Sequence, residues 1–318
     1  MKNNSNTDKP MVTKDNTKFK FSFLHPKNWP LLFAATLLWF ISLLPNAVQT
    51  VLGRALGRLV MKILPSRLKI AQQNLALSFP DKSDTEIKAL AKENFEYTGL
   101  AVIDTANAWF WPDWRIKKNM VIKGQEHIDQ AKADGNGMLI LGAHFLSLEI
   151  SARIFGLLRP AHAIYRPNKS PLMEYLQCRG RTLSNKGLFD RRDIKGMLRI
   201  LAEGEPLWYA PDHDYGRRRS VFVPFFAVEK ACTITATTLF ASGANTKTYP
   251  VSSCRLPDGR YQLIIRAPLE NFPTGDEVED AKRCNQECEK SILEQVPQYM
   301  WLHRRFKTRP EGEPSLYK

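Results

Sequence analysis

Short apolar runs alternate with helix-like segments along the chain after Pro65, and this alternation restricts the possible folds more than any other feature. The clearest run is Met138-Leu139-Ile140-Leu141, which is bounded by glycines and followed by apolar residues at helical spacing from 146 to 157. A run of this kind is typical of a strand that is buried on both faces. Strand–helix alternation favours a parallel sheet between two layers of helices. We therefore expect an α/β fold with a mainly parallel central sheet flanked by helices.

Further elements follow the same pattern. Strands are predicted at residues 163–165, 207–209, 221–223 and 248–254, and helices at residues 85–109, 171–184, 191–203, 231–243 and 277–295. Pro257-Asp258-Gly259 predicts a hairpin turn that pairs residues 248–254 with a further strand at residues 261–266.

The first 64 residues differ in character from the rest. Residues 1–28 are mostly polar and are expected to form a disordered tail. Residues 29–64 are expected to be a hydrophobic membrane anchor followed by a basic amphipathic helix. No charge interrupts the run from Leu31 to Leu44, which as a helix would rise about 21 Å, less than the roughly 30 Å hydrocarbon core. Because no good cleavage site follows, we expect the run to be retained and either to span the membrane once or to lie in one leaflet.

The expected amphipathic helix has a basic stripe beside an apolar one. Arg54, Arg58 and Lys62 recur every four residues. The apolar stripe at helical spacing consists of Leu52, Leu56, Leu59, Val60, Ile63 and Leu64. This pattern is typical of a helix at the surface of an anionic membrane, although a core helix with a solvated basic face produces it too.

Charge and cysteine content limit the partners and the compartment. The chain has 46 Lys and Arg against 32 Asp and Glu, a net charge of +14, which predicts an anionic partner: nucleic acid, acidic membrane or phosphorylated substrate. The five cysteines match no disulfide framework and no zinc site, so we interpret them as structural thiols in a reducing compartment.

Polar side chains follow the buried strand at the edge where α/β sheets bind ligands. His144 and Glu149 lie in Gly142-Ala143-His144-Phe145-Leu146-Ser147-Leu148-Glu149, at the start of a predicted helix. If the ring leans back over the first turn, the carboxylate holds one ring nitrogen and the other is free to take a proton. A histidine that only caps or packs locally is the alternative.

Two further strands end in polar residues. Arg166 follows the strand at 163–165, whereas Asp212, Asp214 and Arg217 follow the strand at 207–209. Each segment alone is typical of a solvated loop, but three such segments at three strand ends indicate a site. Gly-x-Ser-x-Gly is absent, which favours direct attack by an acceptor hydroxyl over a covalent acyl-enzyme.

These segments resemble those of the lipid A late acyltransferases, and in particular their lauroyltransferase branch. The spacing of His144 and Glu149 is similar to the H-x4-D/E motif of membrane-associated acyltransferases. The longer matching strings are His144 to Glu149, Tyr165 to Asn168, Trp208 to Gly216, Val221 to Glu229 and Tyr299 to Gly312. The similarity runs from about Pro45 to the C-terminus. Broader relatives carry Asp at the position of Glu149, and the tail before Lys20 has no counterpart.

The resemblance implies a glycerolipid-acyltransferase-like domain at residues 65–318. It implies transfer of a fatty acyl chain, lauroyl or similar, from acyl carrier protein to a hydroxyl of an acyl chain on the Kdo-lipid IVA precursor, in lipid A and lipopolysaccharide biosynthesis. It implies no metal and no cofactor besides the acyl-carrier-protein co-substrate. The protein is expected at the bacterial inner membrane, with one anchor helix and the catalytic domain facing the cytoplasm.

The resemblance also implies roles for the site residues. His144 is the expected general base on the acceptor hydroxyl, with Glu149 orienting it. Arg166, or backbone amides after Gly142, are the expected donors to the thioester oxyanion. Asp212 and Asp214 are expected to shape this edge. Arginines such as Arg166 and Arg217 suit the phosphates and sugar carboxylates of the acceptor.

Two alternatives come from other classes of protein. A metal-dependent hydrolase would use His144, Glu149, Asp212, His213 and Asp214 as a mixed histidine and carboxylate site. A nucleic-acid-binding membrane protein would explain the basic charge, but the chain has no recognisable nucleic-acid motif. We expect no nucleic-acid partner.

Overall fold

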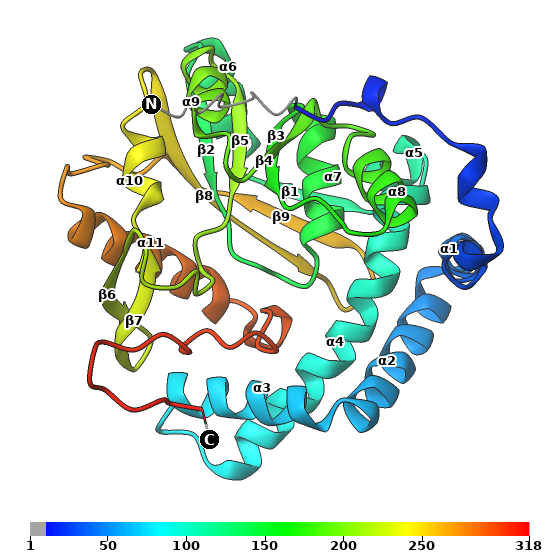
Figure 1. Cartoon of the computed structure of the whole chain (residues 1–318), viewed down its shortest axis with the longest axis horizontal. Helices are drawn as coiled ribbons and strands as arrows, with labels where there is room; N and C mark the ends of the chain where they lie inside the picture. Colours follow the sequence, from blue (N-terminus) through cyan, green and yellow to red (C-terminus); the bar gives the residue numbers. More distant parts are fainter. Residues whose placement is uncertain (1–10, 318) are drawn as a thin grey trace, which may run out of the picture.

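The computed structural model describes residues 11–317 and has a central seven-stranded sheet (Figure 1). In spatial order the strands are β1 (Met120–Lys123), β9 (Tyr261–Ile265), β8 (Thr246–Arg255), β2 (Gly137–Leu141), β5 (Pro206–Tyr209), β3 (His162–Tyr165) and β4 (Gly187–Asp190). Neighbouring strands are parallel except β8 and β9, which form the predicted antiparallel hairpin. The predicted mainly parallel sheet is confirmed.

Helices cover both faces of the sheet because successive side chains of a buried strand point to opposite faces. Met138 and Ile140 of β2 pack with α4, α6 and α7, whereas Leu139 packs with α9 and α10 on the other face. Ser83 and Glu86 form a capping box where α4 begins. The helices after Leu64 are α3 (Pro65–Ser78), α4 (Asp84–Phe110), α5 (Asp113–Lys118), α6 (Gln125–Ala133), α7 (Leu148–Leu158), α8 (Pro171–Arg181), α9 (Ile194–Ala202), α10 (Ala236–Ala241) and α11 (Glu277–Leu293).

Several elements differ from the prediction, which also lacks the helices α3, α5 and α6. The apolar pattern does not predict β1 and β4, which are the two edge strands and have only four residues each. The helix predicted at residues 231–243 is reduced to α10. Its first residues belong instead to β7 (Val228–Ile234), because they pair with β6 (Ser220–Phe225) in a separate two-stranded antiparallel sheet.

The N-terminal strap, residues 11–28, packs along the body although the sequence predicts a disordered tail over residues 1–28. Val12 and Leu188 of β4 exchange two backbone hydrogen bonds, at 3.0 and 2.8 Å. Phe23 is buried, and its ring contacts Tyr175 of α8. The segment therefore packs on the body through apolar side chains that recur among its polar residues. Residues 1–10 of the predicted tail lie outside the described residues.

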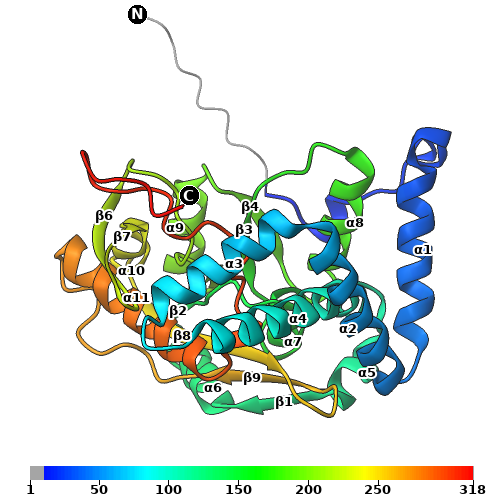
Figure 2. The ribbon, with the colours of Figure 1, turned by 90° about the horizontal axis from the view of Figure 1, so that it is seen from below.

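The strap leads into α1 (Trp29–Leu43) and α2 (Asn46–Ile63), which lie along one side of the molecule (Figure 2). Across residues 11–317, no helix has both the length and the apolar character needed to cross a membrane. The structure therefore does not support the predicted spanning anchor. Large apolar side chains are nevertheless exposed on both helices, namely Trp29, Phe33, Leu37, Trp39, Phe40, Leu43, Val48, Val51, Leu52, Leu59 and Ile63.

The turn between α1 and α2 is fixed by polar side chains of the body. Gln49 donates hydrogen bonds to the carbonyl oxygens of Ser42 and Leu44, both at 3.0 Å. The indole of Trp111 donates to the Ser42 carbonyl at 2.7 Å, and Arg115 donates to the Leu44 carbonyl at 2.7 Å. The carbonyl groups at the end of α1 therefore have partners, and the direction in which α1 leaves the body is set.

A glycine face, not the leucine stripe, packs α2 against α4. The buried residues of α2 are Gln49, Gly53 and Gly57. A Cβ on Gly57 would lie 2.1 Å from the carbonyl oxygen of Phe95, and one on Gly99 would lie 2.1 Å from that of Gly53. Because glycine lets the two backbones touch, the apolar stripe is turned outward. Four residues of the stripe, Leu52, Leu59, Ile63 and Leu64, are exposed, whereas Leu56 is half-buried and Val60 packs against the core.

The basic stripe is partly paired. Glu96 of α4 accepts a hydrogen bond from Arg58 at 2.7 Å and lies 3.9 Å from Arg54. Lys62 is exposed, and no ion pair is found for it within residues 11–317. Part of the charge expected to face a membrane is therefore neutralised within the fold.

A buried polar network joins α4 to the sheet. Asp104 forms an ion pair with Arg255 of β8, and the side chains of both are at least 96% buried. Tyr261 of β9 donates to Asp104 at 2.6 Å and accepts from Asn107 at 2.9 Å. Asn107 also donates to Gln49 at 2.8 Å. A single network thus connects two strands, α4 and the start of α2.

We expect Gly57→Ala to lower the free energy of unfolding by about 1–3 kcal/mol, because its methyl group overlaps the Phe95 carbonyl and the helices must separate. Chemical denaturation followed by circular dichroism measures this loss. Ala55→Leu adds a larger side chain to the exposed face of the same helix and should leave the unfolding midpoint unchanged. Equal losses in the two variants would contradict the close crossing.

Candidate active site

Two neighbouring strands bring the site together. β2 and β5 are parallel and adjacent, with Leu141 opposite Tyr209. The amide of Gly142 continues the ladder by donating to the Tyr209 carbonyl at 2.9 Å. The loops that carry His144 and Asp212 therefore leave the sheet side by side at its carboxyl edge.

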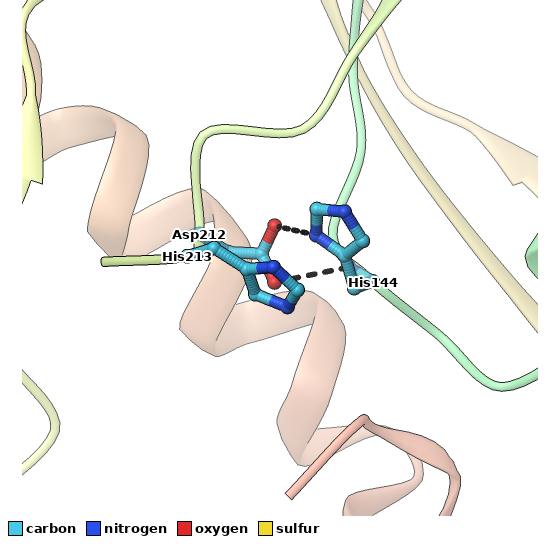
Figure 3. A group of neighbouring side chains, drawn as sticks. All are labelled: His144, Asp212 and His213. Carbon is cyan, nitrogen blue, oxygen red and sulfur yellow. Dashed lines mark hydrogen bonds and ion pairs between the residues drawn. The ribbon is translucent and has the colours of Figure 1, made fainter. Parts of the chain in front are cut away.

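His144 and Asp212 form a closely bonded pair (Figure 3). The ring Nδ1 lies 2.7 Å from Asp212 Oδ1, and the backbone amide of His144 donates to Oδ2 at 3.0 Å. Asp212 is fully buried, whereas the His144 side chain is 22% exposed. Burial raises the pKa of Asp212, but the charge and hydrogen bonds of His144 outweigh it and hold that pKa well below its ordinary value. An ionised carboxylate thus holds one nitrogen of a ring that solvent reaches.

Glu149 does not hold the His144 ring as predicted, because Asp212 occupies Nδ1. Glu149 lies in the first turn of α7, and its carboxylate accepts from Arg181 Nε at 3.0 and 3.2 Å and also from Arg181 Nη2. It also accepts from the Trp109 indole at 3.2 Å. The side chain of Glu149 is therefore bonded to α4 and α8 and not to the loop after β5, which carries Asp212.

Arg181 is a site residue that sequence reasoning misses. It lies on α8 and carries no motif, and only the packing of α7 against α8 brings it to Glu149. A Cβ on Gly180 would lie 2.3 Å from the Trp109 ring, so α8 approaches Trp109 as closely as a glycine allows. Burial alone lowers the pKa of Arg181, but the Glu149 charge raises it above its ordinary value.

Three imidazole rings form a stack at this edge. The rings of His144 and His213 are 3.6 Å apart between centroids and 10° from parallel. The ring of His303, from the C-terminal segment, stacks on His213 at 4.1 Å and 21°. Burial lowers the pKa of His213 to about 3 and also lowers that of His303, so both rings are uncharged at neutral pH. His303 lies in the matching string Tyr299 to Gly312, but nothing in the sequence indicates that its ring meets His213.

The five residues of the predicted metal site are only partly brought together. Ligand atoms of His144, Asp212 and His213 lie within 4.8 Å of one another. Asp214 instead accepts from the amide and hydroxyl of Thr308, at 2.7 and 2.8 Å, and Glu149 is bonded to α8. The lone pair of an imidazole nitrogen lies in the ring plane, so the lone pairs of two stacked parallel rings do not converge on one point. This geometry opposes a metal held by both histidines.

The predicted arginines lie at the same edge. Arg166 directly follows β3, the neighbour of β5, and Arg217 lies in the loop between β5 and β6. Both are exposed, and no hydrogen bond or ion pair is found for either side chain in the described part of the chain. Arg191, which follows β4, is exposed as well. We call these three exposed arginines, each of which lies in a loop that follows a strand of the sheet, the basic rim.

An apolar cavity of about 260 Å³ lies between α1, α4 and α8. Its walls are Leu31, Ala34, Ala35, Leu38, Val102, Thr105, Ala106, Trp109, Phe110, Met173 and Leu176. Trp109 lines this cavity and also donates its indole hydrogen to Glu149. The cavity and the Glu149–Arg181 pair therefore share one wall.

Known proteins match nearly the whole chain. A family model described as bacterial lipid A biosynthesis acyltransferase matches residues 16–308. The chain is 46% identical over 301 residues to a lipid A biosynthesis lauroyltransferase of Escherichia coli strain K12, a match that covers 94% of this chain and 98% of that protein. It is 41% identical, with the same coverage, to a lipid A biosynthesis palmitoleoyltransferase of that strain. It is 27% identical to a lipid A biosynthesis myristoyltransferase of that strain, over 97% of this chain and 98% of that protein.

Proposed function

The chain belongs to the bacterial lipid A biosynthesis acyltransferases, and from that premise we propose its donor, acceptor and chemistry. It transfers a fatty acyl chain, lauroyl or similar, from the thioester of acyl carrier protein to a hydroxyl of an acyl chain on Kdo-lipid IVA. The observation that carries this proposal is the His144–Asp212 pair, which leaves ring Nε2 free at a ligand-binding edge. The basic rim suits the phosphates and carboxylates of such an acceptor.

In this mechanism His144 is the general base. Its Nε2 takes the proton of the acceptor hydroxyl as the oxygen attacks the thioester carbonyl. The buried Asp212 carboxylate stabilises the imidazolium that forms. When the tetrahedral intermediate collapses, the thiolate of the carrier leaves and receives the proton from His144. The proposal needs no metal, because a thioester is already activated for acyl transfer.

Glu149 is a positioning residue in this mechanism. Its bonds to Arg181 and Trp109 fix the first turn of α7 and therefore the loop from Gly142 that carries His144. Arg166 is favoured over backbone amides as the donor to the oxyanion. The amides of His144, Phe145 and Leu146 already donate to Asp212, Ala143 and Gln298.

We further propose that the protein acts at the inner membrane, with the catalytic domain on the cytoplasmic side. Support comes from the exposed apolar side chains of α1 and α2, which together form a lipid-facing surface. The five free and buried cysteines fit a reducing compartment.

The first prediction tests the reaction itself. Purified protein with lauroyl–acyl carrier protein and Kdo-lipid IVA should give a lipid that is heavier by one lauroyl group in mass spectrometry, with or without a chelator. His144→Ala and Asp212→Asn should each lower the rate by about 100- to 10,000-fold with folding intact, because the base or its counter-charge is lost. His127→Ala and Asp129→Asn, on α6 at the other end of β2, are the matched controls. Folded His144→Ala with a near wild-type rate would refute the mechanism.

The second prediction assigns the apolar cavity to the acyl chain of the donor. Ala35→Leu fills part of the cavity and should shift the preferred donor to a shorter chain. Burial of one methylene group contributes about 0.8 kcal/mol. A donor chain with two methylenes that no longer fit in the cavity should therefore lose roughly tenfold in kcat/KM. Competition between lauroyl and decanoyl donors measures the shift. Thr36→Leu, on the exposed side of α1, should leave the preference unchanged. An unchanged preference in Ala35→Leu would place the donor chain elsewhere.

The third prediction concerns the lipid-facing surface. Phe33→Ser and Phe40→Ser together should weaken binding to anionic vesicles, because each side chain is more than half exposed and loses about 1.5–3 kcal/mol of apolar burial. Co-sedimentation with vesicles measures the change. Leu293→Ser, which removes an equally exposed apolar side chain from α11, should have no effect. Undiminished binding of the double variant would show that α1 is not the contact.

A further inference from the structure

We propose that His213 is a positioning residue whose ring, backed by His303, holds the plane of the His144 imidazole so that Nε2 keeps its direction toward the acceptor hydroxyl. The inference rests on the proposed base role of His144. It concerns two residues that take no proton from the substrate in the mechanism above. The observation that carries it is the three-ring stack.

The hydrogen bond that His144 donates to Asp212 does not fix the ring by itself. One bond at Nδ1 fixes the position of one atom, but the imidazole can still tilt about the line of that bond. A second ring stacked at 3.6 Å and 10° from parallel leaves no room for such a tilt on that side. Catalytic groups need to be held within roughly 0.5 Å and 10–20° of the productive geometry. Asp212 and His213 together meet that need, one by hydrogen bonding and the other by contact.

The rear ring of the stack is built into the fold. The carbonyl of His303 accepts a hydrogen bond from Asn74 of α3 at 2.6 Å. The amide of Met300 donates to the His144 carbonyl at 3.0 Å, so the C-terminal segment is tied directly to the catalytic loop. Arg305, fully buried, donates to the Cys232 carbonyl of β7 at 2.8 Å. The segment that carries His303 is therefore fixed by bonds at Met300, His303 and Arg305, and the His303 ring stacks on His213.

The stack is not explained by stability. The Nε2 atoms of His213 and His303 are buried and have no hydrogen-bond partner within residues 11–317. A buried polar atom without a partner destabilises a fold, and an aliphatic side chain would fill the same space without that loss. Two such atoms in one cluster beside His144 indicate that the flat rings serve the site.

The test compares flat and non-flat side chains at position 213. His213→Phe keeps a planar face, whereas His213→Leu fills a similar volume without one. We expect kcat of His213→Leu to fall by about 10- to 100-fold with KM unchanged, because the base is misaligned and not removed. We expect His213→Phe to keep kcat within about threefold. The matched control is His162→Leu, which removes a buried histidine from the start of β3, at the end of the strand that lies away from the site. We expect its kcat to be unchanged.

A second readout does not depend on turnover. The chain has six histidines, so ¹⁵N-histidine labelling gives few ring signals, and His144→Ala identifies that of His144. Wild-type protein should show one sharp tautomer with the proton on Nδ1. His213→Leu should show averaged or broadened signals, and His213→Phe should resemble wild type.

Two outcomes would overturn the proposal. The first is equal kcat and equal His144 spectra in the Phe and Leu variants. The second is a Phe variant as slow as the Leu variant, which would assign a chemical role to the His213 nitrogens. If wild-type protein transfers no acyl group, the proposed function fails, whereas the His144 spectra still decide whether the stack holds the ring.

Discussion

The buried ion pair between Asp104 and Arg255 fixes the position of α4 against β8, and the other parts of the molecule depend on that position. A buried charge is strongly destabilising without its partner, so α4 cannot slide along β8 without breaking the pair. α4 in turn reaches both parts of the site. Near its start, Asn94 donates to the carbonyls of Pro297 and Tyr299 and places the C-terminal segment. Near its end, Trp109 meets Glu149. One helix thus contacts both the C-terminal segment, which carries His303, and Glu149, which follows the loop that carries His144.

The sequence predicts those features of the fold that depend on local pattern. A Gly-bounded apolar run identifies β2 and a short apolar run identifies β5, because strands buried on both faces need unbroken apolar residues. The edge strands β1 and β4 are missed although they are as long as β3 and β5, because each ends in a charged residue, Lys123 or Asp190, that breaks the apolar run. The glycine face of α2 is missed for another reason: the stripe of leucines is the more regular signal, yet the closest contact between helices is made by residues without side chains.

The site is predictable as a location but not as a set of contacts. Strand ends predict that His144, Arg166 and Asp212 follow strands at one edge of the sheet, and in the structure they follow β2, β3 and β5. The spacing of His144 and Glu149 in sequence carries no information on where each side chain points, and the adjacency of β2 and β5 decides that Asp212 is the partner. Arg181 comes from a segment with no chemical motif, and His303 comes from the matching string Tyr299 to Gly312, which indicates no role for it. Likewise, net charge cannot separate the exposed rim arginines from Arg58, which is paired with Glu96.

The strap at residues 11–28 has a consequence for folding order and association. It covers the outer edge of β4 with two backbone hydrogen bonds between Val12 and Leu188, residues that are far apart in the chain. The strap leaves the ribosome early, but its partner strand exists only after most of the sheet has been made. The edge therefore stays open until late in folding, and contacts of such long range form slowly. An open edge is a template for pairing with another chain, so a molecule can associate through β4 until the strap docks and closes that edge.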